Sequence, residues 1–165
     1  MDQTDAFLAA TLPRLHDAEV ALHNGDAGPR MAMWSQDDDV TLFGGVMGGS
    51  GWAEIGPIFQ RLGASFSDCV SFDNEVIAAG ADHDLAYTVA FEHTTATIDG
   101  GAPSAYVLRV TTVFRREDGE WKVVHRHADP AGSPAAGDAL QQLASALTRP
   151  RSLTEIAVNP MREQR

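Results

Sequence analysis

Two histidines and an aspartate occupy alternate positions near the end of the last strand-like segment of the chain. His125, His127 and Asp129 are spaced two apart, so in a strand their side chains point to the same side of the sheet. Histidine gives or takes a proton near neutral pH, and a nearby carboxylate raises the pKa of its imidazole. We predict that His127 is a general acid or base and that Asp129 orients it. His125 or Tyr87 would polarise a carbonyl group of the substrate.

Two other interpretations of these histidines stay open. Both imidazoles could be core residues that hydrogen-bond to the backbone or to Asp129. They could also begin a metal site, with His93 or Glu92 as a third ligand from a neighbouring strand. Any strand with histidines two apart has this spacing, so we predict neither a metal nor a cofactor.

Aromatic side chains could line a pocket beside these groups. Tyr87, Phe91 and His93 share one face of an alternating segment, and Trp121 and Val123 share the predicted face of the later histidines. An aromatic-lined cavity suits a flat, largely apolar ligand, although aromatic residues at these spacings are more often plain core. The predicted ligand-binding residues are Trp34, Trp52, Phe59, Phe91, His93 and Arg109.

Arg109 interrupts an apolar strand-like segment that ends at Phe114. On a buried face the guanidinium would need an ionic partner, and Glu92 on the preceding strand is available. It could then clamp a carboxylate or an enolate in the pocket. If the face with Tyr106 and Leu108 is the core instead, Arg109 lies on the outer face and its ion pair is structural. The second interpretation is the simpler one.

The elements that position these residues follow from periodicity and turn residues. Helices are predicted over residues 4–23, 29–34 and 52–66. Strands are predicted over residues 40–43, 70–77, 85–94, 106–114 and 121–129. Pro13 lies inside the first helix and predicts a kink or a break there. The order of elements predicts an α+β fold in which helices cover one face of a curved antiparallel sheet.

The chain has the size of one domain, at 165 residues and 17.7 kDa. We predict that this domain spans residues 1–130. A weakly structured C-terminal tail would follow over residues 131–165, with a short amphipathic segment at 138–147.

Composition excludes several classes of function. An excess of 23 acidic over 12 basic residues gives a net charge of −11, which argues against binding to nucleic acid or to anionic lipid. No apolar run reaches the roughly 18 residues that a membrane span needs. A single cysteine, Cys69, and an acidic N-terminus favour a cytoplasmic protein. The glycines between residues 44 and 51 lack the strand–loop–helix context of nucleotide binding.

The segment from Leu108 to Pro130, LRVTTVFRREDGEWKVVHRHADP, resembles the nuclear transport factor 2-like superfamily, and within it the SnoaL-like or ketosteroid-isomerase-like group. The resemblance covers roughly residues 5–130. It implies a cone-shaped sheet with the N-terminal helices on its concave face, a pocket between the two layers, and a homodimer packed through the sheet. In ketosteroid isomerases an aspartate acts as the base. Here Trp34 and the aspartate run at residues 37–39 lie near that position, but none of these aspartates aligns with the base.

We therefore expect binding of a hydrophobic small molecule, with cofactor-free isomerisation, cyclisation or dehydration through the histidine–aspartate pair. The competing hypothesis is a non-catalytic binding or assembly module of the same fold. In that case Arg109, Thr111 and Arg126 on the sheet face would matter for oligomerisation.

Overall fold

The structure is a computed structural model that describes residues 1–44, 46–132 and 134–147. Its helices are α1 (Gln3–Leu22), α2 (Gly28–Ala32), α3 (Trp52–Ser65) and α4 (Pro134–Leu147). Its strands are β1 (Thr41–Phe43), β2 (Gly48–Ser50), β3 (Phe66–Asp82), β4 (Leu85–Ile98), β5 (Pro103–Glu117) and β6 (Glu120–Pro130).

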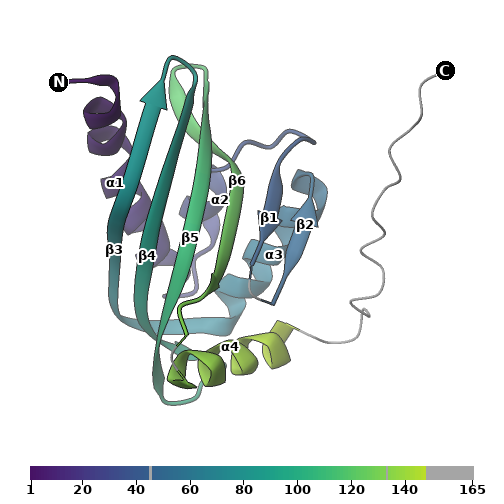
Figure 1. Ribbon diagram of the computed structural model, residues 1–165. Coiled ribbons are helices and arrows are strands. Elements are labelled where there is room, and N and C mark those ends of the chain that lie inside the picture. The colour runs from purple at the N-terminus through teal and green to yellow at the C-terminus, as the bar shows by residue number, and fades with distance from the viewer. Residues whose placement is uncertain (45, 133, 148–165) are drawn as a thin grey trace.

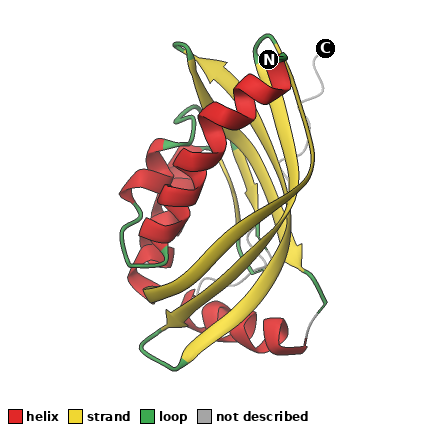
Figure 2. Cartoon of the chain, turned by 90° about the vertical axis from the view of Figure 1, so that its left-hand side faces the viewer, coloured by secondary structure: helices red, strands yellow, loops and turns green. Residues whose placement is uncertain are grey.

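The strands described form one curved six-stranded sheet in the order β2-β1-β6-β5-β4-β3. Neighbouring strands are antiparallel except β1 and β6, which are parallel. Figures 1 and 2 show α1, α2 and α3 on one side of this sheet, with α4 lying across one end. The predicted α+β fold, with helices on the concave face, is confirmed.

Helix α1 buries one stripe against the sheet. Its buried residues recur every three or four positions, as an amphipathic helix requires. They are Phe7, Thr11, Leu15, Ala18, Glu19 and Leu22. Pro13 neither breaks nor ends the helix, because it lies on the exposed side, where water can bond the carbonyl left unpaired by the missing N–H.

The inner and outer faces of β4 differ from the predicted ones. The inner face carries small residues and Glu92, whereas Tyr87, Phe91 and His93 lie on the outer face, where Tyr87 is 46% exposed. The prediction that these three line the enclosed pocket is therefore wrong. The inner face of β4 lies under the helices and is made largely of alanines and threonines. The larger side chains are therefore on the outer face.

A β-bulge in β6 reverses the predicted facing of its second half. Val113 pairs with His125 and Phe114 pairs with Val123, so Val124 is an extra residue without a partner on β5. Such an insertion turns every later side chain to the opposite face. Val123 is buried in the core, but His127 is exposed and Ala128 is buried instead. The prediction that His125, His127 and Asp129 continue the inward row of Trp121 and Val123 is wrong.

The segment after β6 is more structured than expected. Residues 134–147 form α4, and its Ala139 and Leu143 are 2% and 4% exposed within the hydrophobic core. The glycine-rich segment, predicted as turns alone, also contains strand β2. Residues 148–165 of the predicted tail lie outside the described residues.

Candidate functional site

A cavity of about 70 Å³ lies between the helices and the inner face of the sheet. Much of its wall is apolar and comes from α1, α3 and the strands, as with Leu22, Phe59, Leu62 and Leu108. It also contains ionisable side chains from both layers. These are Glu19, His23, Arg30, Glu92, Tyr106 and Arg126.

His23 and Tyr106 form a hydrogen-bonded pair in the cavity wall. Nε2 of His23 lies 2.7 Å from Oη of Tyr106, and Nδ1 lies 2.7 Å from the main-chain oxygen of Glu19. A carbonyl oxygen can only accept, so Nδ1 carries the proton and donates it there. In the neutral imidazole, Nε2 then accepts from the Tyr106 hydroxyl. The pair is buried, with Tyr106 5% and His23 4% exposed.

Burial keeps Tyr106 protonated. Removal from water raises the pKa of this phenol well above its usual range, and the charge of Glu19 raises it further, while a hydrogen bond with Thr94 opposes the shift. Thr94 is the cross-strand partner of Tyr106. The hydroxyl therefore donates a hydrogen bond at any physiological pH.

Glu19 and Arg30 form a buried ion pair on the helix side of the cavity. Nε of Arg30 lies 2.5 Å from Oε1 of Glu19, and Arg30 is 1% exposed. Burial alone would raise the pKa of Glu19, but Arg30, His23 and Arg126 outweigh it and lower the pKa. The guanidinium carbon of Arg30 also lies 5.5 Å from the ring centre of Phe59, a cation–π distance.

Glu92 and Arg126 form a second ion pair on the sheet side. Nη2 of Arg126 lies 2.5 Å from Oε2 of Glu92. Burial raises the pKa of Glu92, with Arg126 opposing the shift and the charge of Glu19 adding to it. Each of the two carboxyl groups in the wall thus has one guanidinium as its partner.

Sequence reasoning assigned no site role to His23, Glu19, Arg30 or Tyr106, and it named Glu92 only as a possible metal ligand or ion-pair partner. One signal was available in α1. Glu19 and His23 follow the same helical stripe as Leu15 and Leu22, and polar groups on an apolar stripe must find buried partners. The partner of His23 lies 83 residues away, and no local spacing predicts it.

The predicted catalytic residues lie on the opposite side of the sheet. His127 and Asp129, with Phe91 and Arg109, line an open groove of about 240 Å³ on the outer face. Asp129 is held by Arg109 through two hydrogen bonds. Arg109 is thus on the outer face, and its partner is not Glu92. The prediction that these four groove residues lie in the enclosed pocket is wrong. Their predicted catalytic and ligand-binding roles stay predictions.

His125 lies beside β1 and not in the cavity. Its Nδ1 is 2.7 Å from Oγ1 of Thr41, and its ring packs edge-on against Phe43. Burial and the neighbouring His127 lower the pKa of His125, while a hydrogen bond to Thr41 opposes the shift. Arg126, expected on the outer face, points into the cavity instead.

The predicted ligand-binding aromatics divide between three places. Phe59 lines the cavity, and Trp34 is buried behind it with the two ring centres 5.4 Å apart. Trp52 is half-buried beside the core. His93 bonds to Glu75 across the outer face at 3.1 Å.

No metal cluster or membrane span is found in the part of the chain that the structure describes. Residues 1–44, 46–132 and 134–147 contain no group of three or more histidine, cysteine or acidic side chains arranged to hold a metal ion. None of the helices within these ranges is long and apolar enough to cross a membrane.

The fold resembles many solved structures. A candidate dehydratase of the nuclear transport factor 2-like family from Streptomyces avermitilis superposes with a TM-score of 0.63 at 19% identity, covering 78% of this chain and 99% of that one. A nuclear transport factor 2-like superfamily protein from Salmonella enterica gives 0.62 at 17% identity, covering 77% and 90%. A candidate calcium/calmodulin-dependent protein kinase type II association domain from Thiobacillus denitrificans gives 0.57 at 19%, covering 78% and 94%.

At these identities the likeness shows the fold alone, and no curated protein matches the chain. The family model of the SnoaL-like domain matches residues 10–131. This range holds both ion pairs and the His23–Tyr106 pair. The fold is thus like that of nuclear transport factor 2-like structures, and the chain itself belongs to the SnoaL-like family.

Proposed function

We propose that the protein binds a small, largely apolar molecule inside the cone and performs cofactor-free acid–base chemistry on it, such as an isomerisation, a cyclisation or a dehydration. The observation that supports this most is the buried His23–Tyr106 pair at 2.7 Å in an apolar-walled cavity. Perturbed ionisable groups in a concave apolar site are typical of acid–base catalysis.

The two side chains would divide the work between them. An oxygen atom of the ligand would accept the hydrogen bond that the Tyr106 hydroxyl otherwise donates to His23. Nε2 of His23 is then free to accept a proton from a neighbouring atom of the ligand. Tyr106 stabilises the negative charge that develops on the ligand oxygen.

The wall favours an uncharged ligand with an oxygen acceptor. Glu19 and Glu92 are already paired with arginines, and an additional charge would need its own partner in this buried space. A ketone or enone meets both requirements. The Streptomyces avermitilis neighbour is described as a candidate dehydratase, and dehydration is one of the reactions included in the proposal.

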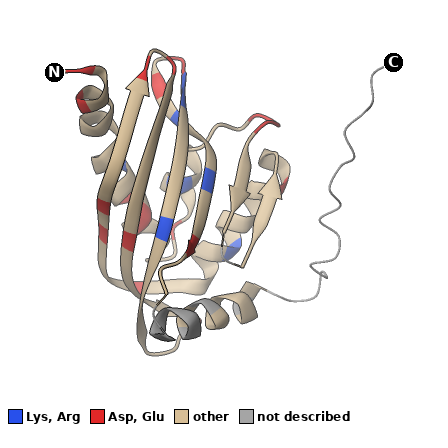
Figure 3. Ribbon diagram, in the orientation of Figure 1, with Lys and Arg blue, Asp and Glu red and all other residues tan. Residues whose placement is uncertain are grey.

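Assembly is a second candidate function, favoured by the outer face of the sheet. Large apolar side chains are exposed there, including Ile77 at 56%, Leu85 at 59% and Tyr87 at 46%. In Figure 3 long stretches of β3, β4 and β5 carry no charged residue. We propose that a second copy of the chain covers this face. The groove with His127 and Asp129 would then lie in the dimer interface.

A cytoplasmic location of the protein remains a prediction.

The two tyrosines of the chain provide a matched test. The melting temperature is measured with a panel of small ketones and cyclic enones on wild type, Tyr106→Phe and Tyr87→Phe. We expect stabilisation of wild type and of Tyr87→Phe, and about tenfold weaker binding by Tyr106→Phe, because one hydrogen bond is lost. If Tyr87→Phe alone weakens binding, or if no compound stabilises wild type, the proposal is wrong.

A further inference from the structure

The C-terminal helix α4 supplies part of the cavity wall from outside the family domain. The match to the SnoaL-like model ends at residue 131, whereas α4 spans Pro134–Leu147. Leu143 of α4 lines the cavity and is 4% exposed. One wall residue is therefore contributed by a segment that the family model does not include.

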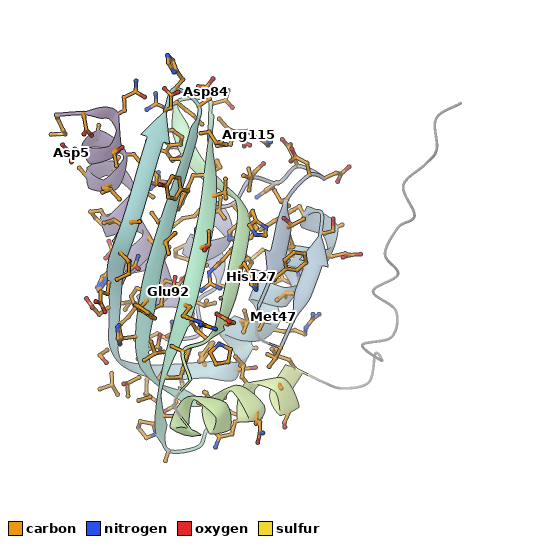
Figure 4. The ribbon with its side chains drawn as sticks, viewed as in Figure 1. Asp5, Met47, Asp84, Glu92, Arg115 and His127 are labelled. Atoms are coloured by element: carbon orange, nitrogen blue, oxygen red, sulfur yellow. The ribbon has the colours of Figure 1, made fainter. Side chains whose placement is uncertain are left out.

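Leu143 and the turn between β1 and β2 both contribute apolar residues to the cavity wall. Val46 and Met47 of this turn also line the cavity. Figure 1 shows α4 crossing the end of the sheet below this turn, and in the same view Figure 4 shows Met47 above α4. This part of the wall is apolar, whereas the groups that can hydrogen-bond a ligand come from α1, α2 and strands β4 to β6.

The chain is fixed just before α4 begins. The N–H of Ala131 donates to the carbonyl of Val107 on β5 at 3.0 Å. Gly132 follows with a φ of +77°, a left-handed conformation that glycine adopts without strain. The backbone thus turns away from the sheet at a defined point, and Ala139 and Leu143 hold the helix against the core.

We propose that Leu143 is a specificity-determining residue that sets how long an apolar ligand the cavity accepts. The inference rests on the proposed function, because it takes the ligand oxygen to be held at Tyr106 and the ligand tail to extend toward α4. A cavity of about 70 Å³ has room for roughly five water-sized groups. The position of one leucine side chain therefore decides whether another methylene group fits.

Methyl ketones from butanone to nonanone are the probes that test this. Their dissociation constants are measured by NMR titration on the full chain, for wild type, Leu143→Ala and Leu143→Phe. Gln142→Ala is the matched control, because Gln142 is the exposed neighbour on the same helix. Circular dichroism verifies that each variant is folded.

For wild type we expect affinity to rise about fourfold with each methylene group and then to stop rising at one chain length. Leu143→Ala should move that limit to longer ketones by about two methylene groups, and Leu143→Phe should move it to shorter ones. Gln142→Ala should keep the wild-type limit. If Leu143→Ala does not fold, the shift in Leu143→Phe decides the question.

The failures of the two proposals are distinguishable. If ketones bind in a Tyr106-dependent manner but all variants share one length limit, the role of Leu143 is overturned and the proposed function stands. If no ketone binds wild type, or if Tyr106→Phe binds every ketone as wild type does, the proposed function is overturned and the role of Leu143 with it.

Discussion

His23 and Tyr106 come from opposite layers of the fold, and a 2.7 Å hydrogen bond joins them inside the cavity. The imidazole is held from its other nitrogen by the main chain of α1, and its ring centre lies 4.4 Å from that of Phe66. Both its tautomer and its orientation are therefore fixed before a ligand arrives. This preorganisation is what an acid–base pair requires.

A double-mutant cycle should show that the two side chains are coupled. Tyr106→Phe leaves Nε2 of His23 buried without its partner, and His23→Leu removes the acceptor of the Tyr106 hydroxyl. Each substitution should therefore lower the free energy of unfolding by about 1–3 kcal/mol. The double variant should lose less than the sum, with a coupling of about 1 kcal/mol. Urea denaturation measures all four proteins. Additive losses would mean that the hydrogen bond contributes nothing to stability.

Breaking the buried Glu92–Arg126 ion pair should destabilise the protein more than replacing both of its residues by apolar ones. Arg126→Met leaves Glu92 without its ionic partner, and we expect a loss of about 3–5 kcal/mol in the free energy of unfolding. Adding Glu92→Leu removes the unpaired carboxyl and should restore part of that loss. Guanidinium denaturation gives both values. A double variant less stable than Arg126→Met would contradict the pairing.

His125 should titrate below its ordinary value of 6.5. The folded state then binds this proton more weakly than the unfolded state does, so the contribution of His125 to stability is complete above pH 6.5 and is lost as the pH falls through the lowered pKa. His127→Gln should raise the pKa of His125, because it removes a neighbouring positive charge. An NMR titration of the imidazole resonances measures both proteins. An unchanged or lower pKa in the variant would refute this cause.

Phe7 should be among the most important residues for stability. It is 1% exposed, and its ring packs edge-on against Phe114 and Trp121, with centres 5.1 and 5.2 Å away. Phe7→Ala should lower the free energy of unfolding by about 3–5 kcal/mol, because it leaves a cavity between α1 and the sheet. His16→Ala, on an exposed position of the same helix, should cost little. Equal effects in urea denaturation would contradict this packing.

A charge on the outer face should separate the proposed dimer. Val89 is 36% exposed and lines the outer groove, so Val89→Glu would place a carboxylate in the interface without disturbing the core. We expect sedimentation equilibrium to show a dimer for wild type and a monomer for the variant. Asp99→Asn, at the exposed turn after β4, should remain dimeric. A wild-type monomer, or a dimer in both variants, would rule out this interface.

The fold was predictable from the sequence, whereas the placement of the site was not. Alternation in β4 and β5 and the helical stripe of α1 predict the layers correctly. Alternation does not say which face is inner, however, and in β4 the larger side chains face outward. In β6 the extra residue Val124 reverses the facing again. A single inserted residue therefore moves His127 from the expected inner face to the outer one.

The interior pairs depend on contacts between distant parts of the chain. Glu92 and Arg126 lie 34 residues apart, and His23 and Tyr106 lie 83 apart. The sequence does indicate that Glu19 and His23 interrupt an apolar stripe. It does not reveal that β5 places a tyrosine over them, because that depends on the register and curvature of the whole sheet.

The central claim is that ligands bind inside the cone and not on the outer face of the sheet. Chemical-shift mapping on isotope-labelled protein with the ketone and enone panel tests it most directly. We predict that the perturbed resonances belong to His23, Tyr106 and Leu143, and that those of Arg109 and His127 stay unchanged. Perturbations confined to the outer groove, or none with any compound of the panel, would contradict the account.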